Sequence, residues 1–298
     1  MNATEEYLDS NTTKGFGEYQ IRPSYYEKII FSVVFLICCI GVPLNGIVIW
    51  FLGFQIKRNP FTILILNLAI ADFGFLISMT LNCIRHFIHG TKPGIFWKIL
   101  SPFFIITYIN GLFLLTAISI DRCVAVLFPI WHHCSRPKYL SSAVCVSLWI
   151  FSFLLGINNI ISCLFSYNAT WDLHLIVTAV LCLPLITIST VILIIKICLK
   201  AEQIKRRRLL MMILITLLCF LILSLPLYIY VFITLFPNKN DLFDVNGLVC
   251  YLDLGASLNS SINPVIYFLV GKKKRARTRE SIKVIFQRVF REEEAPEI

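Results

Sequence analysis

Long apolar runs dominate this chain, and polar residues are concentrated in the short segments between them. Seven such runs occupy 29–52, 61–85, 97–126, 141–163, 173–199, 209–236 and 246–270. A helix of about 20 residues crosses roughly 30 Å, the thickness of the hydrocarbon layer of a membrane. Continuous apolar runs without strict alternation exclude a β-barrel, the other structure that satisfies its backbone in lipid. The pattern therefore predicts an all-α membrane protein, a bundle of seven transmembrane helices.

The composition agrees with one membrane domain over residues 29–270. Hydrophobic residues make up 57% of the 298 positions and charged residues 15%, against about 25% charged in a soluble domain. Internal repeats are not detectable, which disfavours transporters built from inverted repeats. The eleven Cys have no metal-ligand spacing, so no metal site is predicted.

The distribution of charge predicts the orientation in the membrane. Of the 27 Lys and Arg, 20 lie on one side of the spans, around 57–58, 136–138, 205–208 and 272–279. Such basic segments face the cytoplasm, which leaves residues 1–28 as an extracellular tail. Glycosylation sequons at Asn2, Asn11 and Asn168 fall on the same outer side. The basic excess thus indicates topology and contact with anionic lipid, not nucleic-acid binding.

Residues 271–298 no longer form a continuous apolar run, and basic residues are frequent among them. Apolar residues recur there at three- and four-residue spacing, at Ile282, Ile285, Phe286, Val289 and Phe290. This predicts a short amphipathic helix on the cytoplasmic membrane surface, followed by a tail. A polar disordered tail is the alternative.

Polar residues inside the spans are costly and by default mark function. Asp72 lies in the middle of the second span, and other polar residues at a similar depth are expected to converge on it: Asn45, Asn259, Ser260 and Asn263. Such a cluster suits a cation such as sodium, or a shared proton. The alternative is a static hydrogen-bond network between helices.

Prolines interrupt the last two spans. Pro264 follows Asn263 in "NPVIY", with Tyr267 about one turn onward, and Pro226 lies in "FLILSLPLYIY". Each proline frees a backbone carbonyl and bends its helix. Because both helices end at basic cytoplasmic segments, we interpret the two bends as hinges.

Two further charged positions lie in the outer halves of the spans. Asp253 is in the seventh span and Arg85 near the outer end of the second. A structural ion pair between them is one interpretation, and a carboxylate that receives a cationic ligand group is the other. Cys163, and less clearly Cys83 and Cys250, also lie near the outer side. One disulfide from Cys163 is compatible with the spacing, but its partner is not determined.

Asp121 and Arg122 end the third span at its cytoplasmic edge, in "ISIDRCVAVLFPIWHHC". A charge at a membrane boundary is inexpensive, and an arginine can extend to water. This accounts for an arginine but not for the pair.

One motif falls in each predicted span: Asn45, "LNLAIAD" (66–72), "DRC" (121–123), Trp149, Pro184, Pro226 and "NPVIY" (263–267). Together these motifs resemble the rhodopsin-like (class A) G-protein-coupled receptors over residues 28–290. Three stretches resemble the Mas-related receptor family more narrowly: "CVAVLFPIWHHCSRPKYLS", "NSSINPVIYFLVG" and "RNPFTILILNLAIADF". Ser224 lies two residues before Pro226, where most class A receptors carry a tryptophan. The Mas-related family lacks this tryptophan, so Ser224 also fits that family.

The resemblance implies a plasma-membrane receptor, not an enzyme, that binds an extracellular peptide or small amphiphile. It implies activation of a heterotrimeric G protein, Gq ahead of Gi, with arrestin as a further partner. No cofactor is expected apart from sodium at Asp72. The activation switch would comprise Asp121, Arg122, Phe128, Pro129, Phe220, Pro226, Asn263, Pro264 and Tyr267. Candidate ligand-pocket residues are Phe104, Tyr108, Asn159, Asp172, Tyr228, Asp253 and Arg85.

Departures from the family pattern affect the outer disulfide. Trp97 stands where most class A receptors carry a bridged cysteine on the third helix. Some Mas-related receptors instead bridge the fourth helix to the start of the fifth. Cys163 matches the first position of that bridge, but Asp172 stands at the second.

Other departures affect ligand and ion binding. Asn159 and Ile176 occupy positions that hold acids in relatives that bind cationic ligands, so that preference cannot simply be transferred. Gly111 stands where a serine usually assists Asp72.

The arginine of the switch lacks one common restraint. Many class A receptors hold it with an acid on the sixth helix, but the matching segment here is "KRRR" around Arg206. We therefore expect Asp121 to provide most of the resting restraint on Arg122, and the receptor to have measurable basal activity.

Alternatives from other classes remain. One is a receptor-like scaffold or heteromer partner without its own agonist. Another is a channel or transporter that uses Asp72, which the lack of repeats and of further ionisable residues disfavours. An intramembrane enzyme is disfavoured because the adjacent His132 and His133 do not share a helix face.

Overall fold

The computed structural model describes residues 25–89, 95–165, 177–199, 207–224, 229, 245–271 and 284. This part of the chain contains seven α-helices: α1 (Tyr25–Trp50), α2 (Pro60–His89), α3 (Ile95–Leu127), α4 (Leu140–Phe165), α6 (Leu183–Leu199), α7 (Arg207–Leu223) and α9 (Val245–Gly271). It also contains three short π-helices: η1 (Phe51–Gln55), η2 (Trp131–Ser135) and η3 (Thr178–Cys182). Each α-helix lies within one predicted span or within a few residues of it, so the prediction of an all-helical bundle is confirmed.

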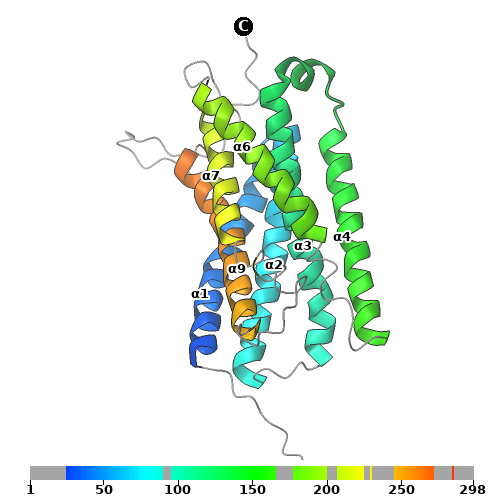
Figure 1. Ribbon diagram of the computed structural model, residues 1–298, viewed down its shortest axis with the longest axis vertical. Helices are drawn as coiled ribbons and strands as arrows, with labels where there is room; N and C mark the ends of the chain where they lie inside the picture. The colour runs from blue at the N-terminus through cyan, green and yellow to red at the C-terminus, as the bar shows by residue number, and fades with distance from the viewer. Residues whose placement is uncertain are drawn as a thin grey trace, which may run out of the picture.

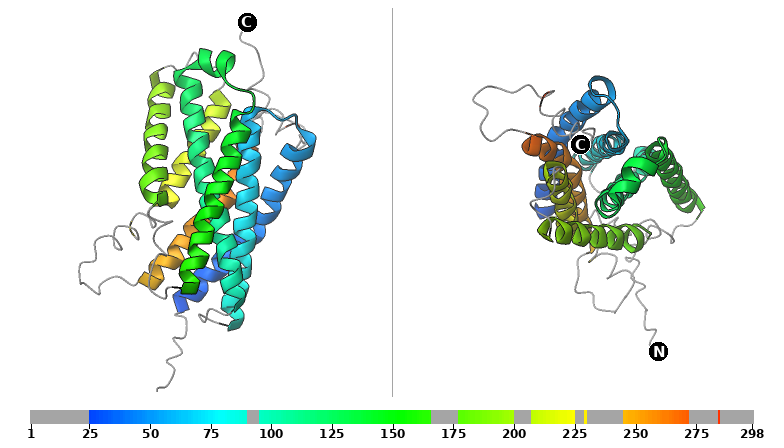
Figure 2. Two further views of the ribbon diagram at one scale, coloured as in Figure 1. Left: turned by 90° about the vertical axis from the view of Figure 1, so that its right-hand side faces the viewer. Right: turned by 90° about the horizontal axis from the view of Figure 1, so that it is seen from above.

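The helices run side by side as an elongated bundle (Figures 1 and 2). α2 and α3 lie at its centre, and α1 packs against both α2 and α9. α4 lies at the periphery against α3 and α2, while α6 packs on α3 and α7. Asp121 lies in the last turns of α3, and we call the end of the bundle where α3 terminates the Asp121 end. We call the opposite end, near Arg85 of α2, the Arg85 end.

Among the described residues, five helical stretches are long and apolar enough to cross a membrane: Tyr25–Gln55, Pro60–Ile88, Leu100–Leu127, Leu140–Ile157 and Val180–Leu199. The described part of α7 adds a shorter apolar helix, Leu210–Leu223. α9 is less apolar because it carries Asp253, Asn259, Ser260 and Asn263. Its polar residues are largely buried against the other helices, so the bundle rather than lipid surrounds them.

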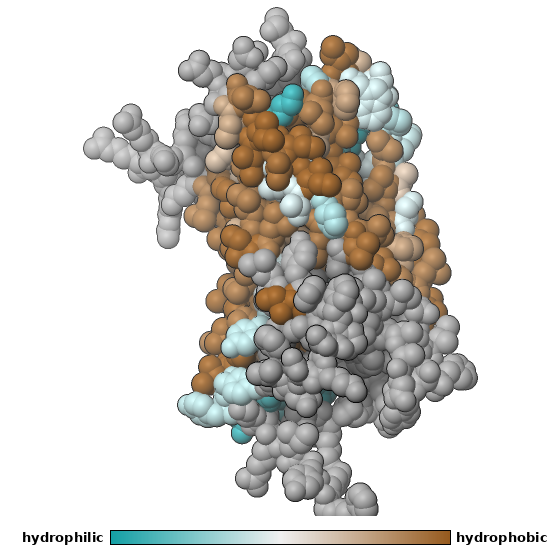
Figure 3. Space-filling model, viewed as in Figure 1, coloured by the Kyte–Doolittle hydropathy of each residue, from teal (hydrophilic) through white to brown (hydrophobic). Residues whose placement is uncertain are grey.

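The surface of the bundle is apolar where lipid would contact it. Figure 3 shows apolar side chains over α6 and α7 on the face towards the viewer. Ile188 of α6, Ile222 of α7 and Leu154 of α4 are among the exposed large hydrophobic residues. In water such a surface would drive aggregation, whereas in a bilayer it is the expected outer surface.

Glycines permit close contact between several pairs of helices in the described part of the chain. A Cβ on Gly41 of α1 would overlap Ser261 of α9, and one on Gly156 of α4 would overlap Ile106 of α3. A Cβ on Gly255 of α9 would lie 2.5 Å from the carbonyl oxygen of Leu223, in the last turn of α7. The backbones of α7 and α9 therefore approach each other just before the predicted hinge at Pro226.

Candidate functional site

The last turns of α3 place Asp121 and Arg122 against each other at the Asp121 end. Arg122 donates a hydrogen bond from Nε to Oδ2 of Asp121 at 3.0 Å, and a second from a terminal nitrogen to the same oxygen. Arg122 is only 2% exposed. An arginine free to extend to water would be exposed, so the side chain is held back within the bundle.

A ring from α2 covers the other side of the arginine. The guanidinium carbon of Arg122 lies 4.1 Å from the centre of the Phe61 ring, and Phe61 is fully buried. A cation on an aromatic face gains about 0.5–2 kcal/mol, more when water is excluded. Arg122 is therefore held by a carboxylate and by an aromatic ring.

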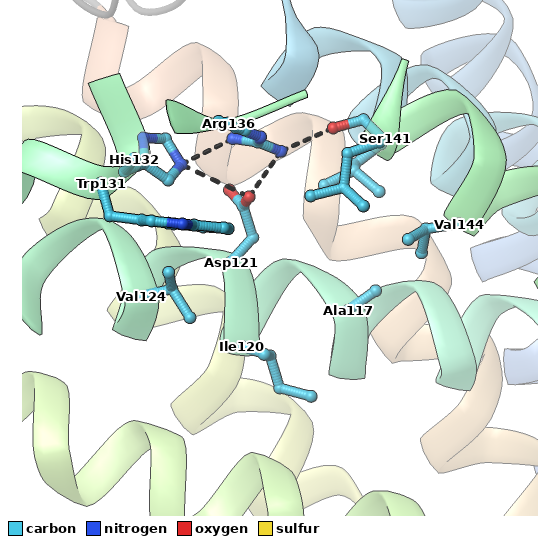
Figure 4. Close-up of a pocket in the computed structure, with 11 residues that line it drawn as sticks. Ala117, Ile120, Asp121, Val124, Trp131, His132, Arg136, Ser141 and Val144 are labelled. Atoms are coloured by element: carbon cyan, nitrogen blue, oxygen red, sulfur yellow. Dashed lines mark hydrogen bonds and ion pairs between the residues drawn. The ribbon is translucent and has the colours of Figure 1, made fainter. Parts of the chain in front are cut away.

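The segment after α3 supplies two further partners of Asp121 (Figure 4). Arg136 approaches Oδ1 of Asp121 at 2.7 Å, and Nε2 of His132 lies 3.5 Å from the same oxygen. Arg136 also lies 2.6 Å from Nε2 of His132 and donates to Oγ of Ser141, in the first turn of α4, at 2.6 Å. We call Asp121, Arg122, His132, Arg136 and Ser141 the Asp121 cluster.

The cluster fixes the turn that carries the exposed motif "FPIW". The backbone N–H groups of Phe128 and His132 donate to Val124 and Phe128, which continues the helical path into η2. Phe128 is 60% exposed and Ile130 80% exposed. Large apolar side chains that protrude beside a buried ionic cluster are typical of a surface for a protein partner.

The polar core lies in the middle of the bundle. Asn263 of α9 donates to Oδ2 of Asp72 at 2.9 Å, and Ser260 contacts the same carboxylate. Asn45 donates to the backbone carbonyls of Gly41 and Ser260, both at 3.0 Å. Of the predicted residues, Asn263 and Ser260 thus meet Asp72, and Asn45 binds the backbone of α9 rather than the carboxylate.

The donor set of this core fits a small cation. The side-chain oxygens of Asn45, Asn259 and Asn263 are buried, and no described residue donates to them. Carboxylate and amide oxygens are the ligands that hard cations prefer. A Cβ on Gly111 would lie 3.6 Å from Oδ1 of Asp72, so position 111 faces the carboxylate that a serine would assist.

Pro264 and Tyr267 of the "NPVIY" motif lie between the polar core and the Asp121 end. Pro264 is inside α9, and Tyr267 is 3% exposed. Tyr267 borders a void of about 10 Å³ between α2, α3 and α7. Phe220 of α7 is buried, and its carbonyl accepts hydrogen bonds from both the N–H and the Oγ of Ser224.

An aromatic cluster occupies the space between α2 and α3 towards the Arg85 end. The ring of Phe75 lies 5.1 Å from that of Phe104 and 5.5 Å from that of Tyr108. Asp253 of α9 is close enough to Tyr108 to interact with it electrostatically. Two candidate pocket residues and the candidate ligand carboxylate are thus neighbours.

The sequence suggests two interactions in the outer half of the bundle, an ion pair between Arg85 and Asp253 and a disulfide from Cys163. Among the described residues, Arg85 donates to Oδ1 of Asn82 on its own helix at 2.9 Å, not to Asp253. Asn82 is one turn away and reaches the guanidinium without any helix having to move. Cys83 and Cys250 are buried in the same apolar cluster, and the side chain of Cys163 lies outside the described part of the chain, so its disulfide stays a prediction.

Several predicted residues lie outside the described part of the chain. They are Asn2, Asn11, Asn168, Asp172, Pro226 and Tyr228, together with Arg206 and all of the expected C-terminal helix except Val284. Asn159 and Cys163 lie on α4, but their side chains are outside the description.

Sequence reasoning missed Phe61, Phe75, His132 and Arg136 as parts of these sites. Phe75 follows Asp72 by one helical turn and so shares its face, which is a usable signal. Arg136 and His132 were counted only as topology and boundary residues, because their approach to Asp121 depends on the path of the loop.

The fold, the Asp121 cluster and the polar core define a class of protein. Residues 44–267 match the family model described as "7 transmembrane receptor (rhodopsin family)". The chain is therefore a rhodopsin-family receptor, a multi-pass membrane protein that signals through G proteins and not an enzyme.

Similarity to individual proteins narrows the family. The chain is 34% identical to "Proto-oncogene Mas" of Homo sapiens over 281 residues, 90% of this chain and 85% of that protein. It is 37% identical to "Mas-related G-protein coupled receptor member H" of Rattus norvegicus over 273 residues, 88% of this chain and 83% of that protein. It is 35% identical to "Mas-related G-protein coupled receptor member X1" of Homo sapiens over 304 residues, 98% and 92% of the two chains. The chain belongs to the Mas and Mas-related receptor family.

Proposed function

We propose that the chain is a plasma-membrane receptor whose Asp121 end faces the cytoplasm and whose Arg85 end receives an extracellular peptide or small amphiphile. Ligand binding would favour a conformation in which the Asp121 end accepts and activates a heterotrimeric G protein. Gq is the expected partner and Gi the second candidate, with arrestin as a further partner.

The observation that carries this proposal is the buried state of Arg122. Its guanidinium lies between Asp121 and Phe61, next to the exposed Phe128 and Ile130. A conformational change that releases Arg122 would expose a cation beside an apolar surface. Arginine and large apolar side chains are enriched at protein interfaces, so release would complete a docking site.

The route from ligand to Arg122 would run through α7 and α9. Asp253 and the Phe104–Tyr108 pair lie towards the ligand end, and the Asp72–Asn263 bond joins α2 to α9 halfway down. The contact of Gly255 with Leu223 then couples α9 to the last turn of α7 before the hinge at Pro226. A ligand shifts such an equilibrium only by its preference for one of the two states.

Biosensors for individual Gα subtypes test the proposal directly. Cells that express the full chain are screened with peptides and amphiphilic amines, and the agonist response is repeated with Arg122→Ala. We expect Arg122→Ala to abolish the response at equal surface expression. Arg58→Ala is the matched control, because Arg58 is an exposed arginine at the same end. An agonist response that Arg122→Ala leaves unchanged would refute this mechanism.

The same assay addresses the ligand site and the alternative function. If Asp253 receives a cationic group, Asp253→Asn lowers the potency of cationic agonists but not that of neutral ones. A scaffold without its own agonist would give no ligand-dependent response with any Gα subtype. The pattern of responses over Gα subtypes decides between Gq and Gi.

A further inference from the structure

A cavity of about 270 Å³ lies between the end of α3 and the start of α4 (Figure 4). It is separate from the polar core and from the aromatic cluster at the opposite end. Most of its wall is apolar, formed by Ala117, Ile120 and Val124 of α3, Leu140 and Val144 of α4, and Trp131 of η2. Its polar end is formed by four members of the Asp121 cluster, Asp121, His132, Arg136 and Ser141.

The cavity is accessible from the membrane-facing side of the bundle. Ile120 and Trp131 line it and are also 39% and 44% exposed, so they border its opening. Both helices that form its walls are membrane-spanning. A ligand that enters from a bilayer and fits an apolar wall with a charged end is an amphiphile.

The charge at the polar end favours an anion. Arg136 lines the cavity, and Arg122 binds Asp121 from outside it, so two arginines share the one negative charge of Asp121 and positive charge is in excess. The volume suits part of a single acyl chain, because it is slightly below the roughly 300–1,000 Å³ of pockets for drug-sized ligands.

Arg136 has donor capacity to spare. A guanidinium has five N–H groups, and the bonds of Arg136 to Asp121, His132 and Ser141 use only its terminal nitrogens. Its Nε is buried without a partner among the described residues, and its side chain is 7% exposed. Buried N–H groups are normally satisfied, so Arg136 is suited to hold one more acceptor.

We propose that this cavity binds a fatty acid from the surrounding leaflet, with its carboxylate on Arg136 and the first part of its acyl chain between α3 and α4. A carboxylate carries one negative charge and so neutralises the excess of the cluster. A phosphate monoester such as that of phosphatidic acid carries up to two negative charges and would be repelled more strongly by Asp121, which lies 2.7 Å from Arg136. The remainder of the acyl chain would lie in lipid along the groove between the two helices.

Photolabelling of the full chain in phosphatidylcholine nanodiscs tests the proposal. The probe is an oleic acid analogue with a photoreactive group near the carboxylate, and its methyl ester is the neutral control. We expect the acid to label peptides around Ile120–Val124 and Leu140–Val144 at least about tenfold more than the ester does, the ratio expected for one hydrogen bond between charged groups. Equal labelling by acid and ester would overturn the proposal.

Two variants and one control variant locate the site. Val144→Trp fills the cavity and is expected to remove the labelling, whereas Val146→Trp, on an exposed face of the same helix, leaves it unchanged. Arg136→Gln is expected to abolish the difference between acid and ester. The thermal stability of each purified variant shows that the fold is retained. Labelling that persists in Val144→Trp, or stronger labelling by a photoreactive phosphatidic acid, would also overturn the proposal.

Discussion

Phe61 of α2 and Arg122 of α3 face each other, with the guanidinium carbon 4.1 Å from the ring centre. The contact joins the two central helices of the bundle at the position where the proposed switch acts. It also gives Arg122 a restraint in addition to Asp121, which the sequence had suggested as the main one.

Removal of the Phe61 ring should weaken this restraint. We expect Phe61→Leu to raise basal G-protein signalling by about two- to fivefold, because a cation–π contact contributes about 0.5–1 kcal/mol. Basal signal per receptor at the cell surface is the measurement. Phe54→Leu is the control, since Phe54 is a phenylalanine at the same end that is 73% exposed. An equal rise in both variants would contradict the role of the ring.

Arg136 should act through the loop that carries "FPIW". Without its bonds to Asp121 and Ser141, the loop loses its anchors to α3 and α4. We therefore expect Arg136→Gln to lower agonist-stimulated coupling about tenfold, since bonds to charged groups contribute roughly 1.5–3 kcal/mol each. Lys138→Gln, at an exposed basic position in the same loop, should have little effect. Agonist affinity measured without G protein should be unchanged in both variants.

Gly255 should be intolerant of a side chain. Because a Cβ there would meet the carbonyl of Leu223 at 2.5 Å, α7 and α9 would have to separate. We expect Gly255→Ala to lower the melting temperature of the purified receptor by at least about 2–4 °C, the shift for roughly 1 kcal/mol in a chain of this size. Gly53→Ala is a matched control, since a Cβ there has no neighbour within 4 Å. A melting temperature that Gly255→Ala leaves unchanged would show that the two helices adjust without strain.

Position 111 should control the response to sodium. A serine there would bring a hydroxyl next to Oδ1 of Asp72 without steric conflict, since its Cβ would lie at an ordinary contact distance of 3.6 Å. If the polar core holds sodium in the inactive state, Gly111→Ser should increase the loss of agonist potency caused by sodium by about threefold or more. Asp72→Asn should abolish that loss. Replacement of sodium by a bulky organic cation at constant ionic strength provides the measurement.

Much of the fold was predictable because the signal is local. Each apolar run specifies its own helix, and the lipid requirement for internal hydrogen bonds leaves no alternative form. The Asp72–Asn263 bond was also within reach, since both residues lie in the middle of long spans and have few other partners at that depth.

The Asp121 cluster was only partly predictable because its geometry is not local. The pair Asp121–Arg122 is adjacent in sequence and was expected to interact. Arg136 and His132 reach Asp121 only because the chain turns through η2 after Leu127. The pairing of Arg85 with Asn82 shows the reverse case, in which a neighbour one helical turn away was available in place of a more distant carboxylate.

The two oxygens of Asp121 serve two arginines, one from the helix and one from the loop. A single negative charge cannot fully neutralise both, so Arg122 and Arg136 compete for it. Whatever draws Arg136 away leaves Arg122 more firmly bound, and whatever draws Arg122 away leaves the loop more firmly anchored. The end of α3 and the loop therefore compete for the same carboxylate. The effects of substitutions at residues 122 and 136 on signalling will not be additive.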